Sequence, residues 1–463
     1  MPHETGTPSE IVLRQLAANE ARHLDELLSL LRIPSVSAQG TGLEDCAAAL
    51  AGIMSSGGIR AELLPTAGAP VVYAHLPGPP GAPTILFYGH YDVQPPDPLD
   101  AWHSPPFEPE IRDGRIWARG AGDNKGQLLA HVFAVQAYLA TGTPLPVGVK
   151  FLFEGEEESG SPNLEGFVAA NRDLLAADVV ITSDGPKHDS GRPLVFFGLR
   201  GLLYVELEAR GANRDLHSGN KGGLAPNPAM ALCRLAATLK TPDNRVAVDG
   251  FYDDVRPPTP YERELLTAIP FDAAALAADL GLSQLDQVGD LSPLEALMFE
   301  PTLNICGLHS GYGGPGGKTV IPARAVMKID MRLVADQDPD DIWLKLQRHV
   351  AQHAPQIELR RRAGGTAPSK TRPDLPVCQA IVAAVRRASG AEPVILPTLG
   401  ASMPDHIFTK TLGLPSVGVP YANPDENNHS PNENLGLAEY YAGIKTSAYL
   451  LEALGRPQGS GTA

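Results

Sequence analysis

Between residues 84 and 182 short apolar runs alternate with longer amphipathic segments, and this alternation restricts the possible folds more than any other feature of the sequence. Residues Thr84–Tyr88, Val147–Phe153 and Val179–Thr182 have the length and composition of buried strands, whereas Gln127–Leu139 and Leu164–Leu175 have the apolar spacing of helices. Strands that alternate with helices favour a mostly parallel sheet with helices on its faces. We therefore predict an α/β fold. Further helices and strands are predicted on both sides of this region. The helices are expected over Ile11–Leu31, Leu43–Met54 and Val377–Ala388. The strands are expected over Ile59–Leu64, Val71–Leu76, Val394–Leu396 and Ser416–Val419.

The pattern changes near Gly201 and returns after about residue 375. Between these points the predicted order is strand, helix, strand, strand, helix, strand, which is the ferredoxin-like arrangement of an α+β domain: Leu202–Leu207, Pro228–Leu239, Leu303–Leu308, Ala325–Val334, Asp338–His349 and Ile357–Arg361. Residues 241–300 interrupt this order as an insertion of mixed character. We predict one α/β domain formed by residues 1–200 and 376–463, split by a second domain over residues 201–375.

The composition excludes several classes of function. With 37 Lys and Arg against 53 Asp and Glu the net charge is -16, and so acidic a surface disfavours nucleic acid and anionic membranes. The chain lacks both a long apolar stretch and the basic and apolar regions of a secretion signal at its start. Its four cysteines are far apart in sequence, which argues against a disulfide framework or a thiolate zinc site. We expect a cytoplasmic protein without nucleic-acid or membrane partners.

Acidic or imidazole side chains follow four of the predicted strands. They are His90 and Asp92 after Ile85–Tyr88, the acidic run Glu154–Glu158 after Phe151–Phe153, Asp184 after Val179–Ile181, and His429 beyond Val417–Val419, with Asp123 on a Gly-rich turn before a helix. Taken singly, these residues have ordinary structural explanations, because Asp123 could cap its helix and Asp184 could belong to a turn. Parallel sheets, however, place ligands beyond the carboxyl ends of their strands, and there these groups would meet.

Such a meeting of groups predicts a metal site. Imidazoles and carboxylates without thiolates suit Zn²⁺ or Mn²⁺. Several carboxylates packed together repel one another unless cations neutralise them, so two ions explain the set better than one. Asp92 is placed to accept the second ring N–H of His90 and orient the imidazole.

Four short motifs carry these groups: Gly89–Pro95, Gly122–Gly126, Glu154–Ser161 and Asn428–Ser430. Together they resemble the dinuclear-zinc exopeptidase family, which includes carnosinases and other dipeptidases, aminoacylase, glutamate carboxypeptidase and succinyl-diaminopimelate desuccinylase. The likeness spans nearly the whole chain and is nearest to the cytosolic dipeptidase branch. The resemblance implies that residues 1–200 and 376–463 form a catalytic domain and that residues 201–375 form a lid and dimerisation domain.

The resemblance also implies roles for single residues. It assigns five ligands to two divalent metal ions, Zn or Mn: His90 and Asp184 on one ion, Glu158 and His429 on the other, and Asp123 bridging both. Glu157 resembles the general base that deprotonates the water between the ions, and Asp92 resembles the residue that supports His90.

The predicted lid domain carries further resemblances. His217 resembles the histidine that reaches into the partner's active site in a homodimer and stabilises the oxyanion, and Arg332 resembles the arginine that binds the substrate carboxylate. Thr319 and Ser402 resemble further substrate contacts. The segment Gly364–Pro368 lacks a histidine that carnosinase-type enzymes have there, so the resemblance does not extend to carnosine as the substrate.

The resulting hypothesis is a metal-dependent dipeptidase, in which a water that bridges two divalent metals attacks the peptide bond. The same site would also serve an N-acyl-amino-acid amidohydrolase or a desuccinylase, because the chemistry is the same and only the pocket beyond the metals differs. A non-catalytic peptide-binding relative is the alternative from another class. It would have lost a ligand or the base, and neither is missing from the sequence.

Overall fold

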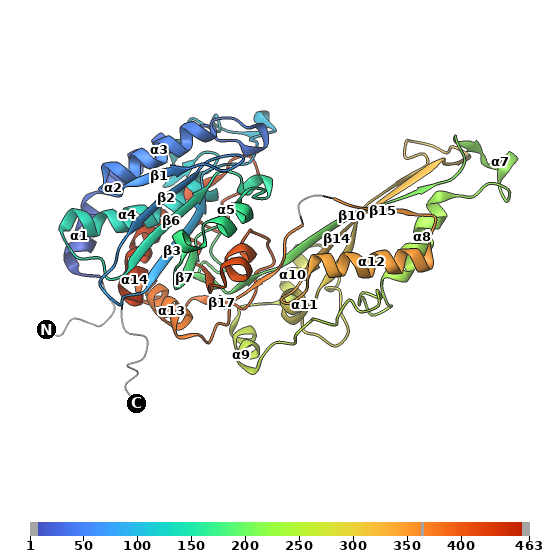
Figure 1. Cartoon of the computed structure of the whole chain (residues 1–463). Coiled ribbons are helices and arrows are strands. Elements are labelled where there is room, and N and C mark those ends of the chain that lie inside the picture. The colour runs from blue at the N-terminus through green and yellow to red at the C-terminus, as the bar shows by residue number, and fades with distance from the viewer. Residues whose placement is uncertain (1–7, 363–364, 456–463) are drawn as a thin grey trace.

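The computed structural model describes residues 8–362 and 365–455, and it has two lobes that are each built on a separate sheet (Figure 1). The first lobe contains the first and the last of the described helices, α1 (Glu10–Ala18) and α14 (Leu437–Leu454), and the second lobe extends away from it (Figure 1). In the described part of the chain, none of the helices has the length and apolar character that a membrane-spanning helix requires.

An eight-stranded sheet forms the centre of the first lobe. Its strands follow the order β1 (Ala61–Leu64), β2 (Val71–Leu76), β6 (Gly148–Glu154), β3 (Thr84–His90), β7 (Val179–Thr182), β18 (Ser416–Gly418), β8 (Leu194–Phe196) and β17 (Val394–Leu396). The central neighbours β6, β3, β7 and β18 run parallel to one another, as does the pair β8 and β17, whereas β1, β2 and the contact of β18 with β8 are antiparallel. The predicted α/β sheet is confirmed.

Helices cover both faces of this sheet, which is why its strands are apolar at successive positions. Along β3, Ile85 and Phe87 point to one face and Leu86 and Tyr88 to the other. The first face packs on a group of long helices: α1 (Glu10–Ala18), α2 (Glu20–Leu31), α3 (Leu43–Ser56), α4 (Gly126–Thr141), α13 (Pro376–Ser389) and α14 (Leu437–Leu454). The second face packs on α5 (Leu164–Ala170), α6 (Arg172–Leu175) and the helical turn Ile407–Leu412.

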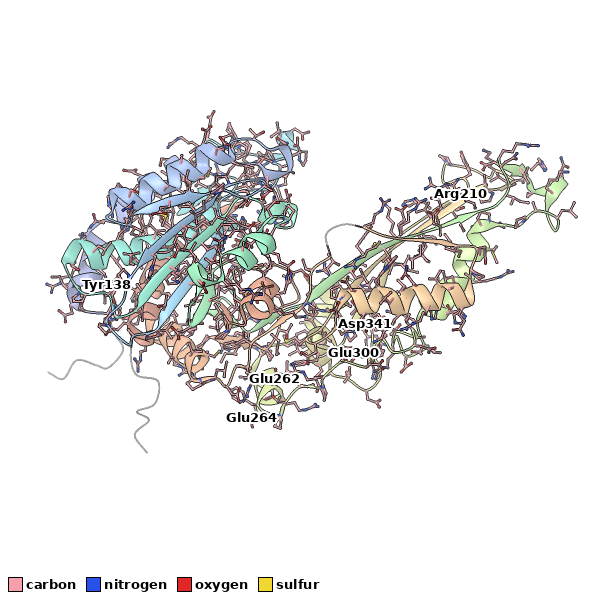
Figure 2. The ribbon with its side chains drawn as sticks, in the orientation of Figure 1. Tyr138, Arg210, Glu262, Glu264, Glu300 and Asp341 are labelled. Atoms are coloured by element: carbon pink, nitrogen blue, oxygen red, sulfur yellow. The ribbon has the colours of Figure 1, made fainter. Side chains whose placement is uncertain are left out.

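The second lobe has the predicted ferredoxin-like arrangement. Its antiparallel sheet follows the order β12 (Thr302–Ser310), β14 (Arg324–Leu333), β10 (Gly201–Arg210) and β15 (Glu358–Arg361), and it packs on α8 (Pro228–Leu239) and α12 (Pro339–His353). Alternate residues of β14 are buried, as expected for a sheet that is covered on one face. At the far tip lie the short strands β11 (Leu216–His217) and β13 (Val320–Ile321) with α7 (Ser218–Lys221), and Arg210 points toward this end (Figure 2).

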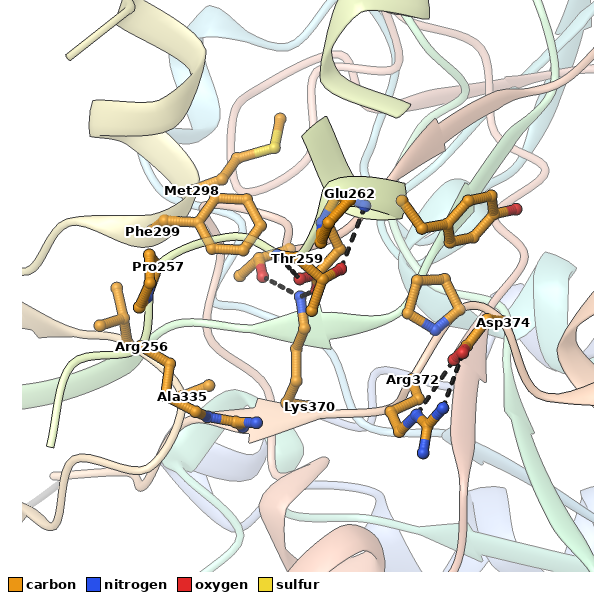
Figure 3. A pocket seen from close by; sticks show the side chains of 15 residues that line it. Arg256, Pro257, Thr259, Glu262, Met298, Phe299, Ala335, Lys370, Arg372 and Asp374 are labelled. Carbon is orange, nitrogen blue, oxygen red and sulfur yellow. Dashed lines mark hydrogen bonds and ion pairs between the residues drawn. The ribbon is translucent and has the colours of Figure 1, made fainter. Parts of the chain in front are cut away.

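Two short strands, β9 (Gly198–Leu199) and β16 (Ser369–Lys370), pair where the chain passes between the lobes. The insertion packs there. Leu266 of α9 (Pro260–Ala268), Ile269 directly after that helix and Met298 of α11 (Pro293–Phe299) belong to a core shared with β8 and β17. Helix α10 (Ala273–Asp279) follows α9. A cavity of ≈ 600 Å³ lies beside this junction (Figure 3). In it the Lys370 ammonium pairs with Glu262 at 2.7 Å.

Two helix predictions differ from the structure, and one long helix was not predicted. Two single predicted helices are each broken at an asparagine, namely Asn19 and Asn171. Each asparagine side-chain amide donates a 2.8 Å bond to the carbonyl four residues earlier, so it competes for the acceptor that the helix backbone uses. The unpredicted helix is α14. This helix is buried over much of its surface and therefore shows little of the polar and apolar periodicity that reveals a surface helix.

Candidate metal centre

The acidic and imidazole residues singled out in the sequence lie at the carboxyl ends of four adjacent strands. His90 ends β3, Glu157 and Glu158 lie in the turn after β6, Asp184 follows β7 by two residues, and His429 lies in the loop after β18. Because β6, β3, β7 and β18 are neighbours in the sheet, segments far apart in sequence meet at one edge. Asp123 reaches the same place from the turn Ala121–Lys125, which precedes α4.

Asp123 lies between the two imidazoles. Its Oδ1 atom is 3.1 Å from Nε2 of His90, and its Oδ2 atom is 3.0 Å from Nε2 of His429. Nε2 of His90 is also 3.4 Å from Oδ2 of Asp184, and Nε2 of His429 is 3.2 Å from Oε2 of Glu158. Asp123 makes no side-chain bond to the start of α4, so it does not cap that helix. The site therefore consists of two donor sets that share one carboxylate.

The donor atoms of this site fit a metal ion. Nδ1 of His90 is 3.1 Å from the Asp92 carbonyl oxygen and 3.3 Å from its Oδ1, so Nδ1–H donates to Asp92. Nε2 then faces only oxygens, and among residues 8–362 and 365–455 it finds no hydrogen-bonding partner of good geometry although it is buried. Two atoms bound to one tetrahedral Zn²⁺ lie about 3–3.6 Å apart, and the separations in both donor sets fall in this range. His90, Asp123 and Glu158 lie close enough together to hold one ion.

The carboxylates around the two imidazoles also favour a cation at this site. Burial lowers the pKa of His90, but contacts with Asp123, Asp184 and Asp92 outweigh burial and raise this pKa well above its ordinary value. Contacts with Asp123 and Glu158 raise the pKa of His429 to about 10. In the metal-free chain, protons on the imidazoles thus supply the positive charge that the carboxylates require. A divalent ion supplies it more completely.

Asp92 contacts two parts of the site, the His90 imidazole and the acidic turn at Glu157 and Glu158. Its Oδ1 accepts the backbone N–H of Glu157 at 3.2 Å, and its Oδ2 accepts that of Glu158 at 3.0 Å. The Glu158 carboxylate also accepts a 2.8 Å bond from Gln94. The Glu157 carboxylate, by contrast, has no hydrogen-bonding partner within the described segments, and burial together with nearby carboxylates raises its pKa well above the ordinary value. Glu157 therefore offers a free carboxylate beside the ligand set.

A buried ion pair that sequence reasoning missed supports Asp123 from behind. The Glu433 carboxylate accepts backbone N–H bonds from Gly120, Gly122 and Asp123, each at 3.0 Å, and a 2.7 Å bond from Nη1 of Arg119. Glu433 and Arg119 are both buried. The pair spans 314 positions in the sequence, so no local pattern could have revealed it.

The four expected substrate contacts form two separate pairs. At the lobe junction Nη1 of Arg332 donates a 2.8 Å bond to Oγ of Ser402. At the tip of the second lobe, Oγ1 of Thr319 lies 3.5 Å from Nε2 of His217. Strand β14 separates the two pairs, because Arg332 is near its end and Thr319 lies before its start at Arg324. At about 3.4 Å per residue β14 alone places them well over 20 Å apart. His217 directly precedes α7, and α7 lies at the tip of the second lobe, far from the first lobe (Figure 1).

Fold and donor set together define a metal-dependent hydrolase with an inserted α+β lobe. The chain belongs to peptidase family M20/M25/M40, which it matches over residues 86–453, and it is a metallopeptidase. Dinuclear metal binding is known in this family, and in this chain His90, Asp123 and Glu158 form the group able to hold an ion.

The relatives differ in the substrates that their names give. Human Beta-Ala-His dipeptidase is 31% identical over 408 residues, which is 83% of this chain and 77% of that protein. The Cys-Gly metallodipeptidase of Candida albicans is 32% identical over 410 residues, covering 84% of this chain and 82% of the relative. The structure of an M20 family metallo-carboxypeptidase from Sulfolobus solfataricus has a TM-score of 0.85 and 38% identity, covering 94% of this chain and 99% of that chain.

Proposed function

We propose that this chain is a dipeptidase with a dinuclear metal centre. One observation carries the proposal: the two oxygens of Asp123 face two different imidazoles, 3.1 and 3.0 Å away, each accompanied by a further carboxylate. A single carboxylate shared by two donor sets is what a bridged metal pair requires. The family match and the dipeptidases among the relatives support the choice of reaction.

The residues would divide into two sites. His90 and Asp184 would hold one ion, His429 and Glu158 would hold the other, and Asp123 would bridge them. Mixed nitrogen and oxygen donors accept both Zn²⁺ and Mn²⁺, so either ion suits the site. When bound, two such ions supply Lewis acid chemistry, which polarises a carbonyl and makes water a stronger acid.

Glu157 would transfer the proton of the attacking water. Its carboxylate is free of hydrogen bonds within the described part of the chain, and Asp92 fixes its backbone N–H. Glu157 accepts a proton from the attacking water and returns it to the leaving amine. The raised pKa of Glu157 suits both proton transfers, because the carboxyl group must keep the proton taken from water until it gives that proton to the leaving amine.

Arg332 would bind the C-terminal carboxylate of the substrate. It lies at the lobe junction, where Ser402 holds one side of its guanidinium at 2.8 Å. The side chain of Arg332 remains 34% exposed, so its other donors are accessible. A guanidinium binds a carboxylate through two parallel hydrogen bonds. Arg332 would therefore select peptides whose C-terminal carboxylate reaches it while the peptide bond lies at the metal ions.

His217 would act on the site of a partner subunit, because it lies too far from the metal centre of its own chain. The His217 imidazole would donate a hydrogen bond to the oxyanion of the tetrahedral intermediate. Strand β12 lies at the edge of the second sheet and exposes Ile305 and Leu308, which gives this lobe a free edge and apolar surface for a homodimer. We thus propose residues 1–200 and 376–463 as catalytic domain and residues 201–375 as lid and dimerisation domain.

We also propose a cytoplasmic location. All four cysteines are free thiols, namely Cys46, Cys233, Cys306 and Cys378, which suits a reducing compartment.

The substrate class is tested by a panel on protein stripped with a chelator and reloaded with Zn²⁺ or Mn²⁺. Dipeptides should be hydrolysed faster than N-acetyl and N-succinyl amino acids, and the stripped protein should be inactive. Preference for the acylated amino acids would instead identify an amidohydrolase or desuccinylase. A reloaded protein that binds peptides but hydrolyses no member of the panel would favour a non-catalytic peptide-binding protein.

A further inference from the structure

Glu426 is a buried carboxylate for which the proposed reaction has no use. It lies in the loop between β18 and β19 (Asn434–Gly436), three residues before His429, and is 1% exposed. In the described parts of the chain, neither of its carboxylate oxygens has a hydrogen-bonding partner. A charged group without a partner is costly to bury, so Glu426 either holds a proton or is compensated by something other than the described residues.

The Glu426 carboxylate lies against the turn that carries Asp123. A Cβ atom placed on Gly122 would be 2.3 Å from Oε2 of Glu426, so a larger residue at position 122 would displace this carboxylate. Asp123, Asp184 and Glu433 are all near enough for their negative charges to act on Glu426, and His429 is the positive group that opposes them. Glu426 thus lies at the edge of the ligand set.

The neighbouring Glu433 shows what Glu426 lacks. Both are buried glutamates beside the same turn, but Glu433 is satisfied by Arg119 and by three backbone N–H groups. The loop could have buried a glutamine or an apolar side chain at position 426 without this cost. A carboxylate so close to the proposed ligands keeps its negative charge more readily when cations are present.

We propose that Glu426 is a positioning residue of the metal centre, whose negative charge strengthens the binding of the two divalent ions without being one of their five ligands. Two such ions bring four positive charges, whereas their proposed ligand carboxylates Asp123, Glu158 and Asp184 bring three negative ones. Glu426 adds a further negative charge beside this set. Outer groups of this kind alter the metal affinity of a site about 10- to 100-fold. The inference rests on the proposed metal centre.

The test compares neutral and charged side chains of equal size at position 426. Wild-type protein and Glu426→Gln form one pair, and Glu426→Asp and Glu426→Asn form a second pair in case the first variant does not fold. Each protein is stripped of metal, and its affinities for Zn²⁺ and Mn²⁺ are measured by competition with a chromophoric chelator. Glu300→Gln is the control, since Glu300 is also a buried glutamate but lies in the second lobe, where it pairs with Arg245 at 3.3 Å (Figure 2).

Glu426→Gln should bind both ions about 10- to 100-fold more weakly than wild type, and Glu426→Asn should bind them more weakly than Glu426→Asp. Glu300→Gln should keep wild-type affinity. Equal affinities within both pairs would overturn this inference alone, and Glu426 would then be a protonated acid that fills space. Wild-type protein that binds neither ion would refute the metal centre itself, and this inference with it.

Discussion

Glu433→Gln is the substitution for which the structure gives the most definite expectation. The Glu433 carboxylate accepts four hydrogen bonds, three from backbone N–H groups of the turn at Gly120–Asp123 and one from the buried Arg119. A glutamine keeps the shape but replaces one acceptor oxygen with an NH₂ group that faces other donors. It also leaves the Arg119 guanidinium without its counter-charge.

Removing one partner from a buried ion pair costs about 3–5 kcal/mol. Whole proteins are stable by only about 5–15 kcal/mol, so Glu433→Gln should remove a large part of the stability of the first lobe. The turn that presents Asp123 should loosen as well, and metal affinity should fall with it.

Urea unfolding of metal-free protein measures this loss without a contribution from bound ions. The chain has three tryptophans, and in a Trp343→Phe background the remaining two, Trp102 and Trp117, report on the first lobe. Glu439→Gln is the control, because the ion pair of Glu439 with Lys187 is partly exposed and should contribute less than about 1 kcal/mol. If Glu433→Gln lowers the free energy of unfolding by as little as this control does, the reasoning is refuted.

Three further predictions follow from the site and the junction. Glu157→Gln should lower kcat by roughly 10²- to 10⁴-fold with unchanged metal content, as measured by elemental analysis, and substantial residual turnover would contradict its role as the base. His217→Ala should lower kcat by roughly 10²- to 10³-fold and also spare the metal. Mixing inactive His217→Ala and Glu157→Gln subunits should restore turnover, since a mixed dimer has one complete site, and failure to do so would argue against a shared site. Lys370→Met should leave the buried Glu262 without its cation at a cost of about 3–5 kcal/mol, and faster proteolysis of residues 241–300 should reveal the loosened insertion.

Much of the fold could be predicted from local sequence patterns. The buried strands β3, β6 and β7 are apolar at successive positions, and this composition requires a sheet covered on both faces. The breaks at Asn19 and Asn171 could not be predicted in this way, because apolar spacing continues across them while a single side-chain amide ends the backbone pattern.

The sequence by itself determined which chemical groups are available and that they follow the ends of strands. It also determined that imidazoles and carboxylates, rather than thiolates, would form the site. These are local properties of spacing and residue type, so they can be read before the chain is folded.

The tertiary structure decided how those groups face one another. Only the docking of the loop before β19 against the turn at Gly120–Asp123 sets the two oxygens of Asp123 toward different imidazoles. The same docking buries Glu433 with Arg119 and leaves Glu426 without a hydrogen-bonding partner among residues 8–362 and 365–455. Such contacts join segments about three hundred residues apart, and their energies come from burial and charge, which are properties of the packed interior rather than of any stretch of sequence.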